Sequence, residues 1–387
     1  MELTNKDLRK WISFLAVTLL VATVASVARA QDPSFPRIQS YGAIEYPSIP
    51  KITISGTDFI ANGEPYMFRG ANIQFTGLHH PESGCQFISR TTFELYKGWN
   101  VNLLRVWLNM EMASPSYGVW DQDFFDYLEL VLDLSEEYEM YVFISGLHSY
   151  GLAPKFDWTG LPDWMFSGIS SINAGMDMLY KAIVQEDPTY QNVRNAIREY
   201  YHRIANICKD RNIVMGYDIF NEPPYRNILG YSKISASYFY ESLSEYITEI
   251  DPDKPQAVEG NFIDDNYKPN IPNLFDAPHG YARHTYDYSL SEMKSMFTRD
   301  GYWVHRSRWN IPMLNGEWFL GTQSEAQSYG LTATEIAQWY DTYITAMEEL
   351  DIGWVVLRCE ATPSRLHWSG DLVKDVLLNH WALNTLP

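Results

Sequence analysis

Apolar and polar residues alternate along this chain in two patterns, one of short apolar runs and one of spaced apolar positions. The short runs predict β-strands near residues 66–73, 101–108, 140–148, 213–221, 256–262, 280–286, 311–317 and 352–359. Apolar residues three or four positions apart predict helices near 89–98, 122–138, 192–210, 231–250, 289–306, 332–350 and 371–381, with a short irregular piece near 265–275. The segment 332–350 shows the helical spacing best, at Ile336, Trp339, Tyr340, Tyr343, Ile344 and Met347. A strand followed by a helix therefore recurs eight times.

Eight strand–helix units in one domain of this size predict an α/β fold, a single (β/α)8 TIM barrel. Parallel strands need crossover helices, and closure of the sheet removes its edges. The alternative is an open doubly wound sheet, but no Gly-rich nucleotide-binding turn follows an early strand. Before the first barrel strand, Asn62-Gly63 in ITISGTDFIANGEPYMF predicts a β-hairpin. We expect this hairpin at the bottom of a barrel domain that spans residues 52–387.

The N-terminus has the features of a signal peptide over residues 1–30. Three basic residues precede an apolar run from Trp11 to about Ser26, and Ala28-Arg29-Ala30 has the small-x-small form that signal peptidase cuts. An uncleaved membrane anchor is the alternative. We expect a secreted, extracellular protein with an N-terminal extension over 31–51 and no stable membrane association after cleavage.

The composition narrows the choice of partners. The net charge is −19, and it becomes −21 when residues 1–30, with four basic and two acidic residues, are removed. Nucleic acids and anionic membranes bind basic surfaces, so neither is an expected partner. A neutral polymer fits better, although acidity is also typical of a protein that only needs to stay soluble. We expect a monomer.

Three cysteines allow at most one disulfide within the chain. Cys85 follows the first barrel strand and Cys359 ends the eighth, so these two could pair across the closing seam of the barrel. The alternative is three unpaired thiols. Cys208 falls on the barrel-facing side of a predicted helix and is expected to be a buried free thiol.

Polar residues stand at the ends of the predicted strands. Strand two carries Arg105, strand three ends at His148, strand four delivers Glu222, and strand seven ends at Glu317. Strand six offers two further polar residues, His284 and Tyr286. The C-terminal strand ends of a barrel converge on one face, where barrel enzymes have their active sites. Burying two carboxylates, an arginine and two histidines together would cost several kcal/mol without a function.

Two carboxylates on strands four and seven suit the cleavage of a glycosidic bond. One gives a proton to the leaving oxygen, and the other supplies negative charge or a nucleophile for the oxocarbenium-like carbon. If the two carboxyl groups lie about 5 Å apart, the reaction retains anomeric configuration through a covalent intermediate.

The motifs together resemble glycoside hydrolase family 5, the cellulase and mannanase family. They are NEP after strand four, GWNVNLLRVW on strand two, HTY on strand six and GEW on strand seven, and the resemblance runs from about Ile52 to Trp381. It implies that Glu222 is the general acid and base and Glu317 the nucleophile. No cofactor or metal is implied.

The resemblance also implies supporting roles. Asn221 would bind the sugar 2-hydroxyl, and Arg105 and Tyr286 would keep the nucleophile ionised and aimed. His148 and His284 match family histidines at the cleavage subsite and near the acid.

Strand eight departs from the family pattern. GWVVLRCE has Leu357, Arg358 and Cys359 where a Trp platform for the sugar is expected, and Trp354 is interpreted as a core residue. Trp318 or Trp368 could replace the platform. The segment 149–191 has no clear element and is rich in aromatic residues, which indicates a cleft wall or packing over the barrel rim. Trp107, at the end of strand two, is a similar candidate for sugar binding.

These features predict a secreted retaining endo-β-1,4-glycanase, most similar to enzymes that act on β-mannan. Other family substrates remain open, namely glucan as in cellulases, xyloglucan and glycolipid head groups. A non-catalytic carbohydrate-binding protein is a second class. A third is a metal-dependent barrel hydrolase, suggested by His79, His80 and Glu82, although these residues lie in a loop without the usual His-x-His spacing.

Overall fold

The computed structural model describes residues 49–73, 88–148, 160–169, 171–223, 231–280, 285, 288–299, 301–318, 330–356 and 371–384. The predicted signal peptide, nearly all of the predicted extension, and the residues Cys85 and Cys359 lie outside these ranges, so the proposed disulfide stays a prediction. Within the ranges, no helix combines the length and the hydropathy of a membrane-spanning segment.

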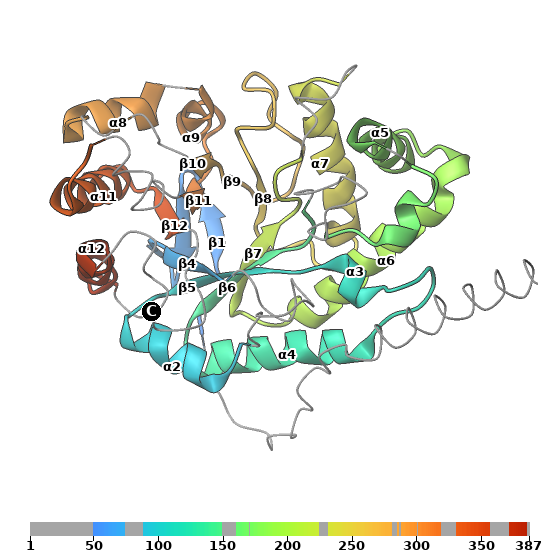
Figure 1. Cartoon of the computed structure of the whole chain (residues 1–387), viewed down its shortest axis with the longest axis horizontal. Coiled ribbons are helices and arrows are strands. Elements are labelled where there is room, and N and C mark those ends of the chain that lie inside the picture. The colour runs from blue at the N-terminus through green and yellow to red at the C-terminus, as the bar shows by residue number, and fades with distance from the viewer. Residues whose placement is uncertain are drawn as a thin grey trace, which may run out of the picture. The chain divides into compact units, whose positions relative to one another are not determined.

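The strands form a closed parallel barrel at the centre of the domain (Figure 1). Their order is β10-β11-β12-β4-β5-β6-β7-β8-β9. The bounds are β4 (Arg69–Ile73), β5 (Leu103–Trp107), β6 (Tyr141–Ser145), β7 (Val214–Asp218), β8 (Gln256–Val258), β9 (Leu274–Asp276), β10 (His279–Gly280), β11 (Leu314–Trp318) and β12 (Gly353–Val356). Because β9 and β10 are two parts of one pass of the chain, the nine strands make eight passes, and the predicted (β/α)8 fold is confirmed.

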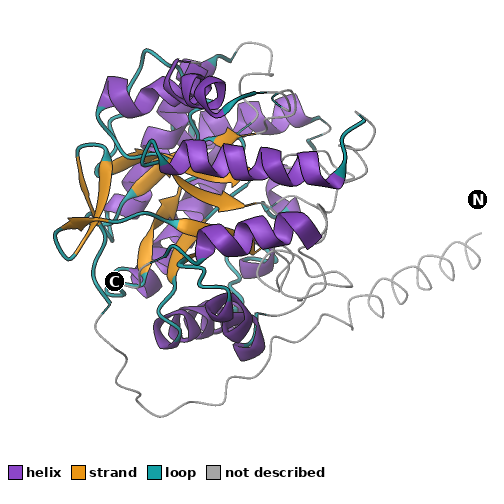
Figure 2. Ribbon diagram, turned by 90° about the vertical axis from the view of Figure 1, so that its left-hand side faces the viewer, coloured by secondary structure: helices purple, strands orange, loops and turns teal. Residues whose placement is uncertain are grey.

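Helices surround these strands (Figure 2). Their bounds are α2 (Arg90–Gly98), α3 (Met110–Ala113), α4 (Gln122–Glu137), α5 (Ile172–Ile183), α6 (Gln191–Cys208), α7 (Lys233–Thr248), α8 (Leu290–Arg299), α9 (His305–Trp309), α11 (Ala333–Glu348) and α12 (Asp371–Trp381), with 3-10 turns η2 (Asp163–Phe166), η3 (Pro188–Tyr190) and η5 (Gly301–Val304). The predicted helix at 332–350 begins with a capping box, in which the side chains of Thr332 and Glu335 each accept the other's backbone N–H.

A three-stranded sheet precedes the barrel, formed by β1 (Thr53–Ser55), β2 (Asp58–Ala61) and β3 (Glu64–Pro65). Asn62 and Gly63, with φ of +52° and +84°, form the predicted two-residue turn between β2 and β3. The ring of Phe59 packs edge-on against Phe68, just before β4, with ring centroids 5.2 Å apart. The hairpin therefore closes the bottom of the barrel, as predicted.

The sixth pass of the barrel begins earlier than the predicted strand at 280–286. It consists of β9 and β10, separated by Ala277 and Pro278, and a bridge between Asp276 and Met313 continues the pairing toward β11. Pro278 has no N–H to donate, so the run LFDAPHG has the sequence features of a turn and not of a strand. The structure nevertheless keeps this segment in the sheet, because Ala277 N–H donates to the Val258 carbonyl and the Pro278 carbonyl accepts from Gly316 N–H.

Two other predicted segments differ from the structure. The segment 149–191, predicted to lack a clear element, contains helix α5, and Ser171 caps its first turn by accepting the Ala174 N–H. The predicted helix 289–306 is interrupted: α8 ends at Arg299, and a 3-10 turn leads into α9.

Two predicted core positions are confirmed. Trp354 is fully buried, with its ring near those of Trp318 and Trp381. Cys208 is a buried free thiol on α6, and burial raises its pKa to about 12.

Candidate active site

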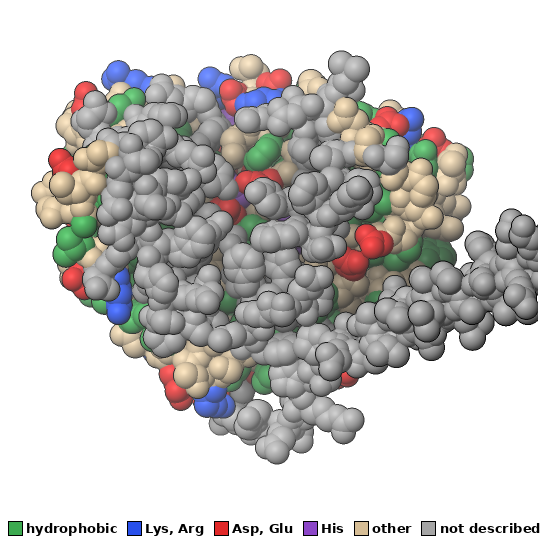
Figure 3. Space-filling view, in the orientation of Figure 1, with side chains coloured by type: hydrophobic (Ala, Val, Ile, Leu, Met, Phe, Trp, Pro, Cys, Tyr) green, Lys and Arg blue, Asp and Glu red, His purple; other side chains and the backbone are tan. Residues whose placement is uncertain are grey.

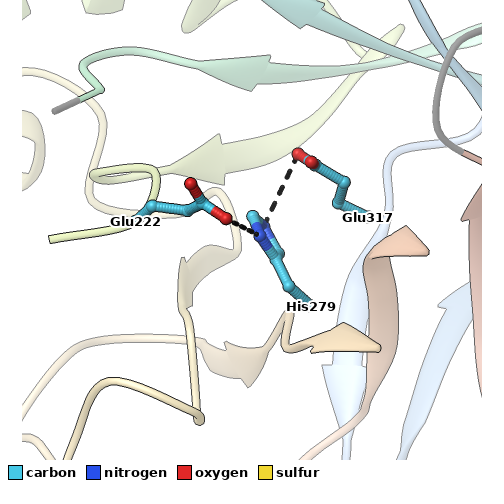
Figure 4. Close-up of side chains that lie close together, drawn as sticks. All are labelled: Glu222, His279 and Glu317. Carbon is cyan, nitrogen blue, oxygen red and sulfur yellow. Dashed lines mark hydrogen bonds and ion pairs between the residues drawn. The ribbon is translucent and has the colours of Figure 1, made fainter. Parts of the chain in front are cut away.

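Glu222 and Glu317 face each other at the C-terminal ends of the barrel strands (Figure 4). Glu317 lies in β11, and Glu222 follows β7, where Asn221 still pairs with His148 across the sheet. One carboxylate oxygen of each acid lies within 4.8 Å of the other and of His279. Acidic side chains are also visible near the centre of the space-filling view (Figure 3). The barrel thus joins two acids that are 95 positions apart in the sequence.

Glu222 is held in an unusual backbone conformation. Its φ is +52°, in the left-handed region that non-glycine residues rarely adopt. The Glu222 N–H donates to Oε2 of Glu259 over 2.9 Å, and Pro223 follows directly. This conformation ends the strand and turns the carboxyl group of Glu222 toward His279. The Glu222 side chain is 18% exposed and that of Glu317 is 5% exposed, so only Glu222 has appreciable access to solvent.

His279, at the start of β10, lies between the two acids. Its Nδ1 is 3.1 Å from Oε1 of Glu222, and its Nε2 is 3.9 Å from Oε2 of Glu317. The same Nε2 is 2.9 Å from Oε1 of Glu259. Burial by itself would lower the pKa of His279, but the charges of Glu259 and Glu317 outweigh burial and raise this pKa well above its usual value. The imidazole is therefore a cation that faces carboxylates.

Arg105 holds Glu317 from the other side. Nη1 of Arg105 donates to Oε2 of Glu317 over 3.0 Å, and Nη2 donates to Asp218 and, over 2.6 Å, to Oδ1 of Asn221. Burial lowers the pKa of Arg105, but the charges of Asp218 and Glu317 raise it further, so the guanidinium stays charged. Arg105 is fully buried, and such a cation is tolerated only with partners of this kind.

Asn72 and Trp107 form a further layer around Arg105. Oδ1 of Asn72, on β4, accepts from Arg105 over 3.1 Å and from the Trp107 indole over 3.0 Å. The Trp107 ring lies 5.0 Å from the guanidinium carbon and near the His148 imidazole. Trp107 is 6% exposed, so the structure places it at the site mainly as a support for Arg105 and His148.

Gly160 lies against the imidazole of His148. A Cβ at residue 160 would lie 2.4 Å from Cδ2 and Nε2 of His148, so only glycine fits there. The Gly160 carbonyl accepts the N–H of Met110, which ties this residue to the segment that follows β5. His148 is therefore fixed beside Trp107 and Asn221.

The structure brings together six of the predicted catalytic and supporting residues. They are Glu222, Glu317, Asn221, Arg105, His148 and Trp107. His284 and Tyr286 lie outside the described residues, so their roles stay predictions.

The assignment of Trp318 to sugar binding is wrong in this structure. Neighbouring residues of a strand point to opposite faces, so Trp318 points away from the face that Glu317 occupies. Its ring is fully buried and stacks on Tyr343 of α11, with centroids 5.1 Å apart. The strand alternation alone could have shown this.

Four residues of the site were missed by the sequence analysis. They are Asn72, Asp218, Glu259 and His279. A signal for His279 was present, because His279-Gly280-Tyr281 repeats the His-x-Tyr pattern of HTY a few positions earlier; Tyr281 lies outside the described residues. Glu259 directly follows β8, a strand for which no polar end residue was predicted.

Glu222, His279 and Glu317 are close enough to hold a metal ion, but their chemistry is unfavourable for one. A metal-binding histidine must be neutral, whereas carboxylates raise the pKa of His279. The Arg105 cation also lies 3.0 Å from Glu317. This arrangement fits proton transfer and nucleophilic attack better than metal binding.

A closed (β/α)8 barrel with two facing glutamates and a charged arginine on one of them defines the class of a barrel glycoside hydrolase. A sequence model of the cellulase family, glycosyl hydrolase family 5, matches residues 61–361. The chain therefore belongs to glycoside hydrolase family 5, as its motifs indicated.

Curated relatives and solved structures are similar at low identity. Mannan endo-1,4-beta-mannosidases 5 and 2 of Solanum lycopersicum are each 19% identical over 207 residues, 52% of this chain and 48% of theirs. The chain thus spans about half the length of these relatives. Endo-glycoceramidase II from Rhodococcus sp. has a TM-score of 0.60 at 18% identity, covering 80% of this chain and 75% of that one. The endo-1,4-beta-mannanase from Rhizomucor miehei has a TM-score of 0.61 at 16% identity, covering 86% and 98%.

Proposed function

We propose that this chain is an endo-acting β-glycanase that hydrolyses its substrate with retention of anomeric configuration. The observation that carries the proposal is the separation of the two acids, whose nearest carboxylate oxygens lie within 4.8 Å. Retaining enzymes place their carboxyl groups about 5 Å apart, whereas inverting enzymes need roughly 6.5–9.5 Å to admit a water molecule.

Glu317 is the nucleophile in this proposal, and Glu222 is the general acid and base. Glu222 gives its proton to the glycosidic oxygen while Glu317 attacks the anomeric carbon, which breaks the bond to the leaving sugar and forms a glycosyl ester. Glu222 then takes a proton from water, whose oxygen displaces Glu317 and restores the starting configuration.

The surrounding charges support this division of roles. Arg105 donates directly to Glu317, which orients this carboxyl group for nucleophilic attack. Glu222 contacts His279 and is the more exposed of the two acids, so it can exchange protons with water. Asn221 accepts from Arg105 through Oδ1, which leaves its buried Nδ2 with no hydrogen-bond partner among the described residues. This amide is placed to donate to a sugar hydroxyl.

We propose β-1,4-mannan as the substrate, because the curated relatives are named as mannan endo-1,4-beta-mannosidases and a solved mannanase shares the fold. A β-linked glycolipid head group is the second candidate, because an endo-glycoceramidase shares the fold to a similar extent. We also propose that the protein is secreted, on the signal-peptide features of residues 1–30, and that it acts as a monomer without a cofactor.

A hydrolysis panel tests the proposal. Purified protein is incubated with galactomannan, glucomannan, carboxymethylcellulose, lichenan and a glycosphingolipid, with Glu317→Gln as the matched blank. We expect new reducing ends and an early fall in viscosity with the mannans, and NMR should show the β-anomer first. Release of the α-anomer would contradict retention. Binding without hydrolysis would favour the carbohydrate-binding alternative, and activity on the glycosphingolipid alone would favour the second substrate.

A further inference from the structure

Glu259 is a buried acid that the proposed reaction does not use directly, although it contacts the catalytic groups. It follows β8 and is fully buried. Oε2 of Glu259 accepts the backbone N–H of Glu222 over 2.9 Å. Oε1 lies 2.9 Å from Nε2 of His279 and 3.8 Å from Nη2 of Arg105. One carboxylate thus connects the backbone of one catalytic acid to the two cations of the site.

We propose that Glu259 is a positioning residue of the glycosidase reaction, which fixes the left-handed backbone of Glu222 and keeps His279 charged as the donor to the Glu222 side chain. This inference rests on the roles proposed for Glu222 and Glu317. Glu259 acts through Glu222 and His279 and has no direct part in bond making or breaking.

The backbone part of the proposal follows from the conformation of Glu222. A glutamate in the left-handed region is strained and persists only where its surroundings enforce this conformation. The N–H of Glu222 donates to a carboxylate, and such charge-assisted bonds are stronger than neutral ones. Without this acceptor, the N–H of Glu222 would lose its charge-assisted bond and the backbone could relax, which would move the Glu222 carboxyl group.

The charge part follows from the neighbours of Glu259. Its carboxylate oxygens face the N–H groups of Glu222, His279 and Arg105, which an ionised carboxylate can accept. Burial raises the pKa of Glu259 to about 8, and the facing His279 cation lowers it, so the negative charge of Glu259 and the positive charge of His279 support each other. The other ionisable groups nearby are Asp218 and Tyr240, and Glu317 lies beyond His279. Of the neighbouring charges, Glu259 contributes most to raising the pKa of His279. Glu259 therefore helps both imidazole nitrogens to keep their protons, and the one on Nδ1 faces Glu222.

Glu259→Gln separates the two effects. The glutamine oxygen can still accept the Glu222 N–H, but its amide group would then point an N–H at Nε2 of His279. That nitrogen must lose its proton to accept the bond, so His279 becomes neutral. The substitution removes the negative charge of Glu259 and the positive charge of His279 together. The positive charge is the one in direct contact with the Glu222 carboxyl group, at 3.1 Å, so its loss dominates and this acid keeps its proton to higher pH. We expect the alkaline limb of the pH profile of kcat/KM on polysaccharide to move to higher pH.

The leaving group provides a second readout. Glu259→Ala should lower kcat on polysaccharide by about 100-fold or more, because protonation of the leaving oxygen depends on the placement of Glu222. A dinitrophenyl glycoside leaves without a proton, so the rate of its glycosylation step should fall much less. If Glu259→Ala does not fold, the pH profile of Glu259→Gln still decides the question.

Asp276 offers a matched control on the neighbouring strand. It is also a fully buried acid, and it accepts one backbone N–H, from Gly260, and contacts one histidine, His305, each at 2.7 Å. Among the described residues, the Asp276 side chain bonds to Gly260 and His305 and not to Glu222, His279 or Glu317. Asp276→Asn should lower the melting temperature and leave the pH profile in place.

Covalent labelling separates the two proposals. An activated 2-deoxy-2-fluoro glycoside should label Glu317 in the wild type and in Glu259→Gln, as shown by mass spectrometry of a digest. If the wild type is not labelled at Glu317, the assignment of the acids is wrong, and the role of Glu259 is lost with it. If labelling is normal but the pH profile of Glu259→Gln is unchanged, or if Asp276→Asn shifts the profile equally, Glu259 is only a structural residue.

Discussion

Arg105 donates from Nη1 to Oε2 of Glu317 over 3.0 Å, although two other strands, β12 and β4, lie between β5 and β11 in the barrel. The contact is buried, since the side chains are 1% and 5% exposed. Nη2 of the same guanidinium donates to Asp218 and Asn221, so that Arg105 is fixed on both sides. One planar cation thereby aims the proposed nucleophile and also orients the amide of Asn221 beside Glu222.

Arg105→Lys should lower kcat by roughly 100- to 1,000-fold and change KM much less. A lysine keeps the positive charge but cannot bond Glu317, Asp218 and Asn221 with one fixed fork. Steady-state kinetics on galactomannan, or on the best substrate of the panel, measures the effect. The matched control is Arg69→Lys. Arg69 is the first residue of β4, at the end of the strand that lies away from the active site, and its guanidinium donates to Glu348 over 2.6 Å. If Arg105→Lys raises KM and leaves kcat unchanged, Arg105 contributes to substrate binding and not to the action of Glu317.

Glu317→Ala should abolish turnover, and Glu222→Ala should lose about 10²- to 10⁴-fold on polysaccharide. Azide or an activated aryl glycoside should partly rescue Glu222→Ala, because neither route needs its proton transfers. NMR of the azide product should show retained configuration. Rescue of Glu317→Ala with retention, and no rescue of Glu222→Ala, would show that the roles are reversed.

A chelator should leave the activity unchanged. The cationic Arg105 and the raised pKa of His279 disfavour a metal ion between the two acids. The rate is measured after dialysis against EDTA and again after addition of Zn²⁺, Mn²⁺ or Ca²⁺, with a known metalloenzyme as the positive control. Loss of activity in EDTA and its recovery with one of these ions would revive the metal-dependent alternative.

His380 should make stability depend on pH at the other end of the barrel. Its Nδ1 lies 3.1 Å from a carboxylate oxygen of Glu348, and its Nε2 lies 3.2 Å from one of Asp341. These two contacts attach α12 to α11. Burial lowers the pKa of His380, but the bonds to Glu348 and Asp341 outweigh burial and raise it above its usual value. Because the pKa of His380 is higher in the folded than in the unfolded protein, the protonated histidine stabilises the fold. This stabilisation is complete below the unfolded-state pKa of about 6.5 and is lost as pH rises through the folded-state pKa.

His380→Asn should therefore lower the free energy of unfolding by about 1–2 kcal/mol near pH 5.5 and by less above pH 8. Urea unfolding at several pH values measures this difference. His202→Asn is the control, because His202 pairs with Glu249 at the surface, where solvent weakens such pairs. If the difference in unfolding free energy between the wild type and His380→Asn stays constant across the pH range, His380 contributes by packing alone.

The sequence by itself determined the barrel and its two acids. Hydrophobic periodicity is a local property, so every strand except the sixth and most helices were predicted within a few residues of their bounds. The helix at 332–350 was recognisable from one apolar face. Glu222 and Glu317 were found because strand ends on one face of a barrel must converge. Helix α5 was missed although Ser171 and the apolar positions Met176, Leu179 and Ile183 carry the helical signal.

Tertiary structure decided which neighbours complete the site. Pro278 removes the local strand signal, so only pairing with β8 and β11 shows that the sixth pass contains His279. The assignment of Glu259 required knowing that its carboxylate reaches the backbone of Glu222 and the ring of His279. Periodicity fixes which residues form a strand, whereas contacts between strands depend on register and closure, which are long-range properties that no single segment encodes.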